Sequence, residues 1–198
     1  CVPEMAGTWN GPLMLTHKAG LPLEDWLSQI SGLAQIRGGP SVSNVCYALA
    51  LALGCRTVAF VGQDLAFGEG RTTHAAGAGW DGQTIENFAQ LSGRVRPVPG
   101  SVEDEVLTDD FFYLVKCTLE ESIQYDRGRD DTLRVVDATE GGARIEGTEV
   151  TPLAEFLAAH VTPREPFPEP PARLLHARPL DDPERRGGVR REFAQLGE

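Results

Sequence analysis

The segment SVSNVCYALALALGCRTVAFVG, residues 41–62, constrains the fold more than any other part of the chain. Ser41 follows a glycine pair and can cap a helix, the next twelve residues are almost wholly apolar, and Gly54 is a natural helix stop. Residues 57–61 then read as a strand without polar alternation. A helix that is apolar all round and a strand covered on both faces predict a parallel α/β sheet.

Other segments continue this alternation of helices and strands. Residues 108–128 are predicted as a helix that is capped by Thr108, ended by Gly128 and marked by an apolar stripe of Phe112, Val115, Leu119 and Ile123. Shorter elements are expected as strands at 11–17 and 133–139, a helix at 21–30, a hairpin from 95–99 and 102–107, and a last helix with Thr151 as cap and Pro152 at its first position. The fold class is therefore α/β with crossover connections.

Polar residues gather where the two central strands end. Gln63 and Asp64 follow the first strand, with Thr73 and His74 shortly after, and Asp137, Thr139, Glu140, Gly141 and Gly142 follow the second. Ligands bind beyond the carboxyl ends of strands in an open parallel sheet. The start of the helix at Ser41 and Val42, behind Gly38 and Gly39, adds free N–H groups that suit an anion.

Each of these features also has an explanation without a ligand. The glycine pair can be only a tight turn, Asp64 can cap a helix or bond its own loop, and His74 can be a surface histidine. The spacing of the glycine, serine, cysteine and histidine residues matches no dinucleotide fingerprint, phosphate-binding P-loop, nucleophile elbow or zinc site. Spacing alone therefore indicates an α/β domain with an anionic-ligand site and no named reaction.

Two blocks resemble a known family. GGPSVSNVCYALALALGCRTVAFVGQDLAF…GRTTHA and DATEGGARIEGTEVTPL resemble the family shared by the MptE-like 6-hydroxymethylpterin diphosphokinases and the bacterial Maf motility accessory factors, over about residues 35–155. The resemblance implies a Rossmann-like, mostly parallel sheet flanked by helices. It also implies a transferase that moves diphosphate from ATP to a pterin alcohol, or a nonulosonic acid from a CMP donor to flagellin. The opening strand and GAGPSL-type loop of that family have no counterpart here, so we expect a fragment that lacks them.

The resemblance also implies roles for the polar residues. Asp64 is expected to orient the donor or a Mg²⁺ ion, and His74 to act as general base. Donor and phosphate binding is expected at Gly38, Gly39, Ser41, Val42, Gln63, Thr73, Glu140, Gly141 and Gly142. The alternative is a non-catalytic ligand-binding or scaffold module derived from the same fold.

Composition limits the partners and the domain organisation. The 198 residues carry a net charge of −11, which argues against nucleic acid and anionic membranes, and neither a membrane span nor a signal peptide is visible. We therefore expect a cytoplasmic protein with a small phosphorylated donor. Half of the 14 prolines lie in residues 163–198, which predicts a tail or linker after a domain of residues 1–162.

Overall fold

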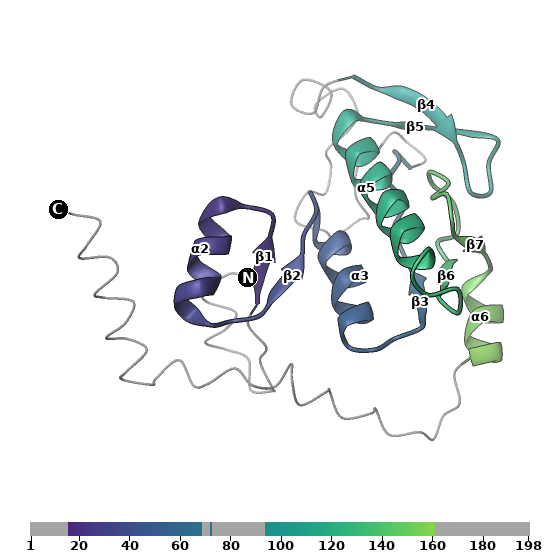
Figure 1. Ribbon diagram of the computed structural model, residues 1–198. Coiled ribbons are helices and arrows are strands. Elements are labelled where there is room, and N and C mark those ends of the chain that lie inside the picture. Colours follow the sequence, from purple (N-terminus) through teal and green to yellow (C-terminus); the bar gives the residue numbers. More distant parts are fainter. Residues whose placement is uncertain (1–15, 69–71, 73–93, 161–198) are drawn as a thin grey trace, which may run out of the picture. The chain divides into compact units, whose positions relative to one another are not determined.

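The computed structural model describes residues 16–68, residue 72 and residues 94–160, which fall into two compact units (Figure 1). The first unit contains β1 (His17–Ala19), α2 (Pro22–Ser31) and β2 (Gln35–Arg37). β1 and β2 pair in parallel, and α2 connects them. The predicted helix at 21–30 is confirmed within one residue. β1 begins only at His17, so it shares a single residue with the strand expected at 11–17, of which residues 11–15 lie outside the described residues, and β2 was not predicted.

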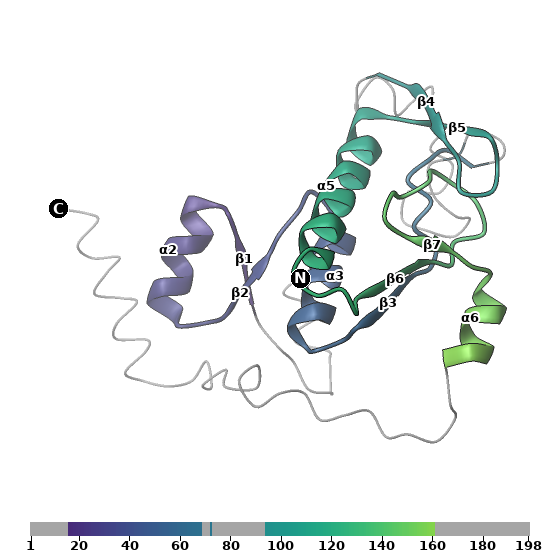
Figure 2. The ribbon, with the colours of Figure 1, turned by 45° about the vertical axis from the view of Figure 1, so that its right-hand side comes forward.

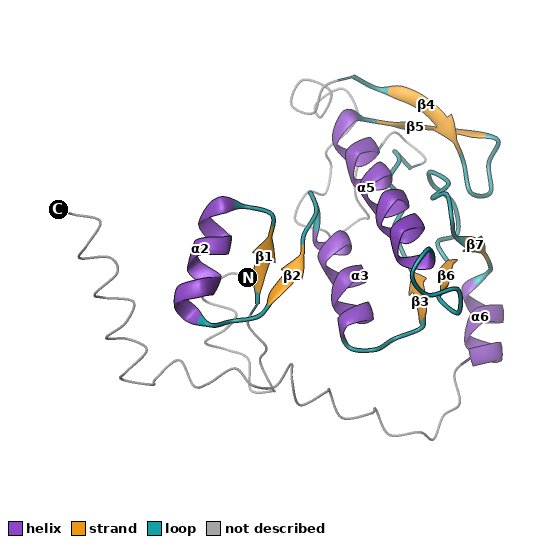
Figure 3. Cartoon of the chain, in the orientation of Figure 1, coloured by secondary structure: helices purple, strands orange, loops and turns teal. Residues whose placement is uncertain are grey.

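The second unit holds the predicted parallel strands. Its elements are α3 (Val42–Ala52), β3 (Thr57–Phe60), β4 (Arg96–Pro99), β5 (Glu105–Thr108), α5 (Asp110–Arg127), β6 (Arg134–Asp137), β7 (Glu149–Val150) and α6 (Leu153–His160). β3, β6 and β7 form one sheet in that order, with both pairs parallel, and β4 and β5 form the expected antiparallel hairpin. The helices around these strands confirm the predicted α/β, Rossmann-like class (Figure 3).

The register of β3 and β6 determines where their loops emerge. Thr57 pairs with Arg134 at one end of the two strands, and Phe60 pairs with Asp137 at the other. The loops that begin at Val61 and Ala138 therefore leave from the same edge of the sheet, as the strand-end rule requires. The backbone N–H of Ala138 donates to the carbonyl of Phe60 at 2.9 Å, which holds the two strand ends together.

The core of this unit is built on one face of α5. Val115, Leu119 and Ile123 are almost fully buried, as the predicted stripe requires, and they pack with Tyr47, Phe60, Val135 and Ile145. α3 and α5 lie side by side in both views, and the buried Asn44 side-chain amide donates to the carbonyl of Val115 (Figures 1 and 2). Apolar residues spaced three and four apart thus hold α5 against the sheet and α3.

The start of α5 differs from the prediction by one residue. The cap is Asp109, whose Oδ1 accepts from the N–H of Phe112 at 2.7 Å. Thr108, predicted as the cap, is instead the last residue of β5, fully buried, with its hydroxyl donating to the carbonyl of Leu65 at 2.7 Å. A carboxylate oxygen suits the positive end of a helix, so the neighbouring Asp takes the capping position. The predicted stop at Gly128 is confirmed.

The expectation that α3 is buried all round is wrong. Only Asn44, Tyr47 and Ala48 are buried, while Val42 and Cys46 are exposed. Within the described residues of this unit, β3 pairs on one edge only, with β6. Its other side opens into what we call the apolar groove, about 430 Å³ in volume, lined by Val42, Ser43, Cys46, Tyr47, Ala50, residues 58–61 and Gln63. Apolar composition here reflects an open face and not a closed core.

Candidate functional site

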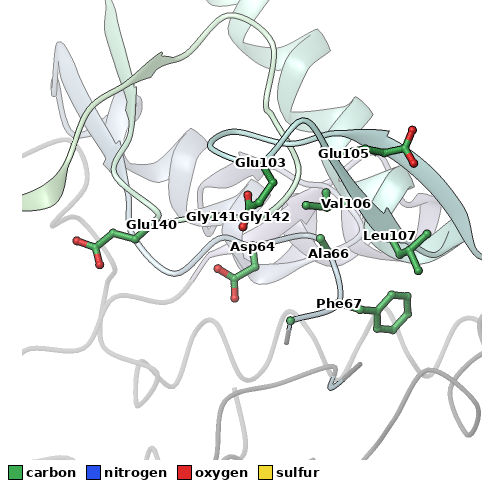
Figure 4. A pocket seen from close by; sticks show the side chains of 11 residues that line it. Asp64, Ala66, Phe67, Glu103, Glu105, Val106, Leu107, Glu140, Gly141 and Gly142 are labelled. Atoms are coloured by element: carbon green, nitrogen blue, oxygen red, sulfur yellow. The ribbon is translucent and has the colours of Figure 1, made fainter. Parts of the chain in front are cut away.

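Three segments that are distant in the sequence surround one pocket at the carboxyl edge of the sheet. We call this pocket the acidic hollow; its volume is about 580 Å³ (Figure 4). The loop after β3, the β4–β5 hairpin and the loop after β6 supply its walls. The lining residues are Asp64, Ala66, Phe67, Gly68, Glu103, Glu105, Val106, Leu107, Glu140, Gly141 and Gly142. Four of them are carboxylates and, among the lining residues described, none is a lysine or arginine.

Hydrogen bonds hold the two strand-end loops at a fixed separation. The N–H of Gln63 donates to Thr139 Oγ1 at 3.0 Å, and the N–H of Ala143 donates to the carbonyl of Asp64 at 2.7 Å. The N–H of Thr139 in turn donates to Asp137 Oδ1 at 3.0 Å. Backbone around Asp64 is therefore anchored to β6 and its loop, which fixes the position from which the Asp64 side chain leaves.

The hairpin is attached to the same loop by Ser101. Its N–H donates to the carbonyl of Gly142 at 2.8 Å, and its hydroxyl donates to the carbonyl of Gly141 at 2.7 Å. These contacts bring the Glu103 carboxylate over Gly141, close enough for its charge to act on Asp64, while Glu105 points away from Asp64 (Figure 4). Backbone hydrogen bonds therefore fix the walls of the hollow, and its shape does not depend on the positions of flexible surface side chains.

Gly142 allows the closest of these approaches. Its φ is +84°, and a Cβ there would lie 2.3 Å from the carbonyl oxygen of Asp64. Real Cβ atoms do not approach backbone so closely, and L residues other than glycine rarely adopt this conformation. Two independent constraints therefore require glycine at the floor of the acidic hollow.

Burial and mutual repulsion shape the ionisation of the hollow. The surrounding protein partly desolvates Asp64, although its side chain is exposed at the mouth, and this burial together with the Glu103 charge raises the pKa of Asp64. Burial also raises the pKa of Asp137, against the hydrogen bonds from Thr139 that lower it, and the Asp64 charge adds to the rise. Asp137 is 1% exposed, and among the described residues its Oδ2 has no hydrogen-bond partner. In the part of the chain that the structure describes, no positive side chain pairs with Asp64 or Asp137, so a cation would stabilise the site.

The raised pKa of Asp137 leads to a prediction about stability. A carboxyl whose folded pKa lies above its ordinary value of 3.8 destabilises the fold once it ionises. Asp137→Asn keeps an oxygen for the N–H of Thr139 and removes the charge. We expect this variant to gain free energy of unfolding relative to the wild type as the pH rises from about 3.8 through the raised pKa, with little difference at lower pH. Urea titrations across this range measure the difference.

Asp130→Asn is the control, because the pKa of Asp130 is shifted in the opposite direction from that of Asp137. The hydrogen bond from the Thr132 side chain lowers the pKa of Asp130, so its charge stabilises the fold. The Asn variant should be less stable than the wild type near neutral pH, and the difference should vanish as the pH falls through the lowered pKa. A parallel pH profile for both variants would contradict the assignment of Asp137.

The structure brings some of the predicted site residues together and separates others. Asp64, Glu140, Gly141 and Gly142 line the acidic hollow, whereas Gln63 and Val42 line the adjoining apolar groove. Ser41 precedes the first turn of α3, where its N–H donates to Asn44 Oδ1 at 3.1 Å. Thr73 and His74 lie outside the described residues.

The glycine pair before α3 is packed against side chains. A Cβ on Gly38 would meet the Lys18 side chain, and a Cβ on Gly39 would lie 2.3 Å from Cβ of Asn44. Asn44 is buried and hydrogen-bonded, so it cannot yield. Gly39 therefore has a packing role at the entry to α3, independent of any ligand.

Sequence reasoning missed Glu103 and Glu105 as members of the site. Both stand in the acidic run VEDEVL that was predicted only as part of a hairpin. No local pattern shows that this hairpin folds over the loops after β3 and β6, because Ser101 makes the connection through tertiary hydrogen bonds.

The predicted Mg²⁺ site depends on the oxygen ligands that the acidic hollow offers. Among the described residues, no three or more His, Cys, Asp or Glu side chains form a group that could hold a metal ion. Mg²⁺ commonly uses only one or two carboxylates and completes its shell with waters and substrate phosphates. Asp64 and Glu103 fit that smaller requirement, because each offers carboxylate oxygens and no described residue of the lining is a cation.

Comparison with known proteins supports the family predicted from the sequence. Residues 1–70 match the family model described as 6-hydroxymethylpterin diphosphokinase MptE-like. The match includes the first 34 residues, which the resemblance left outside, and ends before His74 and the second block at residues 137–153. No curated protein and no solved structure matches the chain. In the part of the chain that the structure describes, no helix has both the length and the apolar character needed to cross a bilayer.

Proposed function

We propose that this chain is a transferase domain that binds a nucleotide donor as its Mg²⁺ complex at the acidic hollow. The observation that carries the proposal is a pocket at the carboxyl ends of two parallel strands, lined by four carboxylates and, in its described part, by no basic side chain. A bare phosphate would be repelled there, whereas a phosphate that arrives with Mg²⁺ is not. The match of residues 1–70 to a diphosphokinase family supports this class of reaction.

The donor would extend across two adjoining sites. Asp64 faces the acidic hollow, and the preceding residue, Gln63, lines the apolar groove beside the first turn of α3. Because Val42 lines the same groove as Gln63, a phosphate bound next to Mg²⁺ at Asp64 would reach the start of α3, where Val42 would offer its backbone N–H. The N–H of Ser41 already donates to Asn44 Oδ1, so Ser41 would hold the first turn of α3 in place beside the phosphate. Glu140, Gly141 and Gly142 would close the opposite wall, with Gly38 and Gly39 shaping the entry to α3.

The reaction favoured by the family match is diphosphate transfer from ATP to the hydroxyl of a pterin alcohol. The hydroxyl oxygen attacks the β-phosphorus, the bond between that phosphorus and the α-phosphate oxygen breaks, and AMP leaves. His74 would accept the hydroxyl proton as general base, and Thr73 would contact the phosphates. Mg²⁺ would supply charge stabilisation to the phosphate oxygens.

Calorimetry on the full chain tests donor binding. ATP, CTP and CMP are titrated with and without Mg²⁺, and we expect ATP to bind only with Mg²⁺. Preferential binding of CMP or CTP would contradict the diphosphokinase assignment and favour glycosyl transfer from a CMP donor to a protein such as flagellin. The absence of heat with every nucleotide would overturn the transferase proposal and leave a non-catalytic module.

The role of His74 is tested separately from binding. His74→Ala should leave the affinity for the ATP–Mg²⁺ complex unchanged and slow AMP formation about a hundredfold, which is a usual size for the loss of a general base. AMP release in the presence of a hydroxymethylpterin measures the rate. Loss of nucleotide affinity in this variant would assign His74 to binding and contradict its proposed role.

A further inference from the structure

We propose that Ser31 in the first unit is an activated serine nucleophile that reacts with small acyl or phosphonyl electrophiles. The residues that carry this proposal are His17, Glu24 and Ser31, all outside the acidic hollow. His17 Nε2 lies 2.9 Å from Ser31 Oγ, and His17 Nδ1 lies 2.8 Å from Glu24 Oε2. A hydroxyl bonded to an imidazole that is oriented by a carboxylate is the general signature of an activated nucleophile.

The local sequence explains why these three side chains meet. Glu24 stands in the first turn of α2 and Ser31 is its last residue, so the two are seven positions apart and lie on the same face of the helix. His17 opens β1, the strand that α2 connects to β2, and its ring spans the distance between them. The side chain of His17 is 17% exposed and that of Glu24 is 35% exposed, so the group is shielded without being closed to solvent.

Hydrogen-bond chemistry assigns the direction of each bond. An ionised carboxylate can only accept, so in the neutral imidazole the proton is on Nδ1 and points to Glu24. Nε2 is then an acceptor, and the Ser31 hydroxyl must donate to it. This is the tautomer that a general base needs in order to remove the proton from a serine hydroxyl.

One backbone donor would stabilise the charge that develops on Ser31. The N–H of Leu33 lies 3.3 Å from Ser31 Oγ and donates to it. The neighbouring N–H of Gly32 is already bonded to the carbonyl of Ser28. Ser31 also lies at the negative end of α2, which opposes an alkoxide. We therefore expect a serine that is labelled by reactive electrophiles, with slow turnover of ordinary esters.

A fluorophosphonate probe tests the proposal on the full chain. Ser31 Oγ attacks phosphorus, the P–F bond breaks, fluoride leaves, and the serine proton passes to His17 Nε2. Mass spectrometry of the peptide that contains both Ser28 and Ser31 locates the adduct. Ser28 is the internal comparison, because its hydroxyl donates to the carbonyl of Leu33 and is not bonded to a base.

The variants separate activation from mere exposure. His17→Gln should slow labelling of Ser31 about a hundredfold. Glu24→Gln should slow it less, since the amide oxygen can still accept from Nδ1–H while the carboxylate charge that fixes the tautomer is lost. Ser31→Ala should abolish the adduct, whereas Ser28→Ala should leave the rate unchanged. The urea-unfolded chain gives the rate of an unactivated serine. Labelling of native Ser31 at that unfolded rate, or labelling that His17→Gln does not slow, would overturn the proposal.

Discussion

Replacing Gly142 by alanine is expected to destabilise the second unit and to remove the acidic hollow. The new Cβ would lie 2.3 Å from the carbonyl oxygen of Asp64 and 2.6 Å from its Cα, so backbone must move on one side or the other. The left-handed φ of +84° costs a further amount of about 1–3 kcal/mol for a residue with a side chain. Urea unfolding measures the total loss. We expect it to exceed the conformational cost alone, because Ala143 would also lose its bond to the Asp64 carbonyl.

Gly54→Ala is the matched control for this prediction. Gly54 has a similar φ of +96°, lies in the same unit, and has open space where its Cβ would be. Its substitution therefore measures the conformational cost without a collision. If Gly142→Ala were no more destabilising than Gly54→Ala, the close approach between the two loops would be wrong, and so would the geometry of the hollow.

The parts of the fold that were predictable from sequence are those in which a local pattern and its tertiary environment agree. The central residues of β3 and β6 are apolar, and the rule for parallel strands is enough to place Asp64 and Glu140 at one edge of the sheet. α5 carries a stripe that its position against the sheet requires. In these cases the residue types leave few alternatives.

The parts that were not predictable depend on contacts between distant segments. β7 is two exposed residues, and β2 is three residues with only Ile36 buried, so neither has enough length to show a period. Glu103 reaches Asp64 because Ser101 bonds the glycine loop some 40 residues further on. The exposure of Val42 and Cys46 was unpredictable for the same reason. An apolar helix sequence shows that each face of the helix is suited to burial, but it does not show which other segment packs against that face.

The Asp64→Asn variant is expected to lose Mg²⁺-dependent nucleotide binding by at least about tenfold. Even residues that only support a metal ligand typically cost 10- to 100-fold in affinity when changed, so loss of the ligand itself should reach that range. The amide keeps the shape of the side chain and loses the charge. Titration of ATP at fixed Mg²⁺ measures the change, and ATP without Mg²⁺ should bind the variant no worse than the wild type, since one repelling charge is gone.

Glu105→Gln separates the ligand role of Asp64 from the total charge of the hollow. Glu105 lines the same pocket and carries the same charge, but its side chain points away from Asp64 (Figure 4). This variant should bind the ATP–Mg²⁺ complex nearly as the wild type does.

The raised pKa of Asp64 adds a second readout, because protons compete with Mg²⁺ for an ionised carboxylate. Wild-type affinity should fall as the pH decreases toward that raised pKa, and Asp64→Asn should lack this component. Equal losses of affinity for the ATP–Mg²⁺ complex in Asp64→Asn and Glu105→Gln would show that only the total charge of the hollow matters and that Asp64 is not the metal ligand.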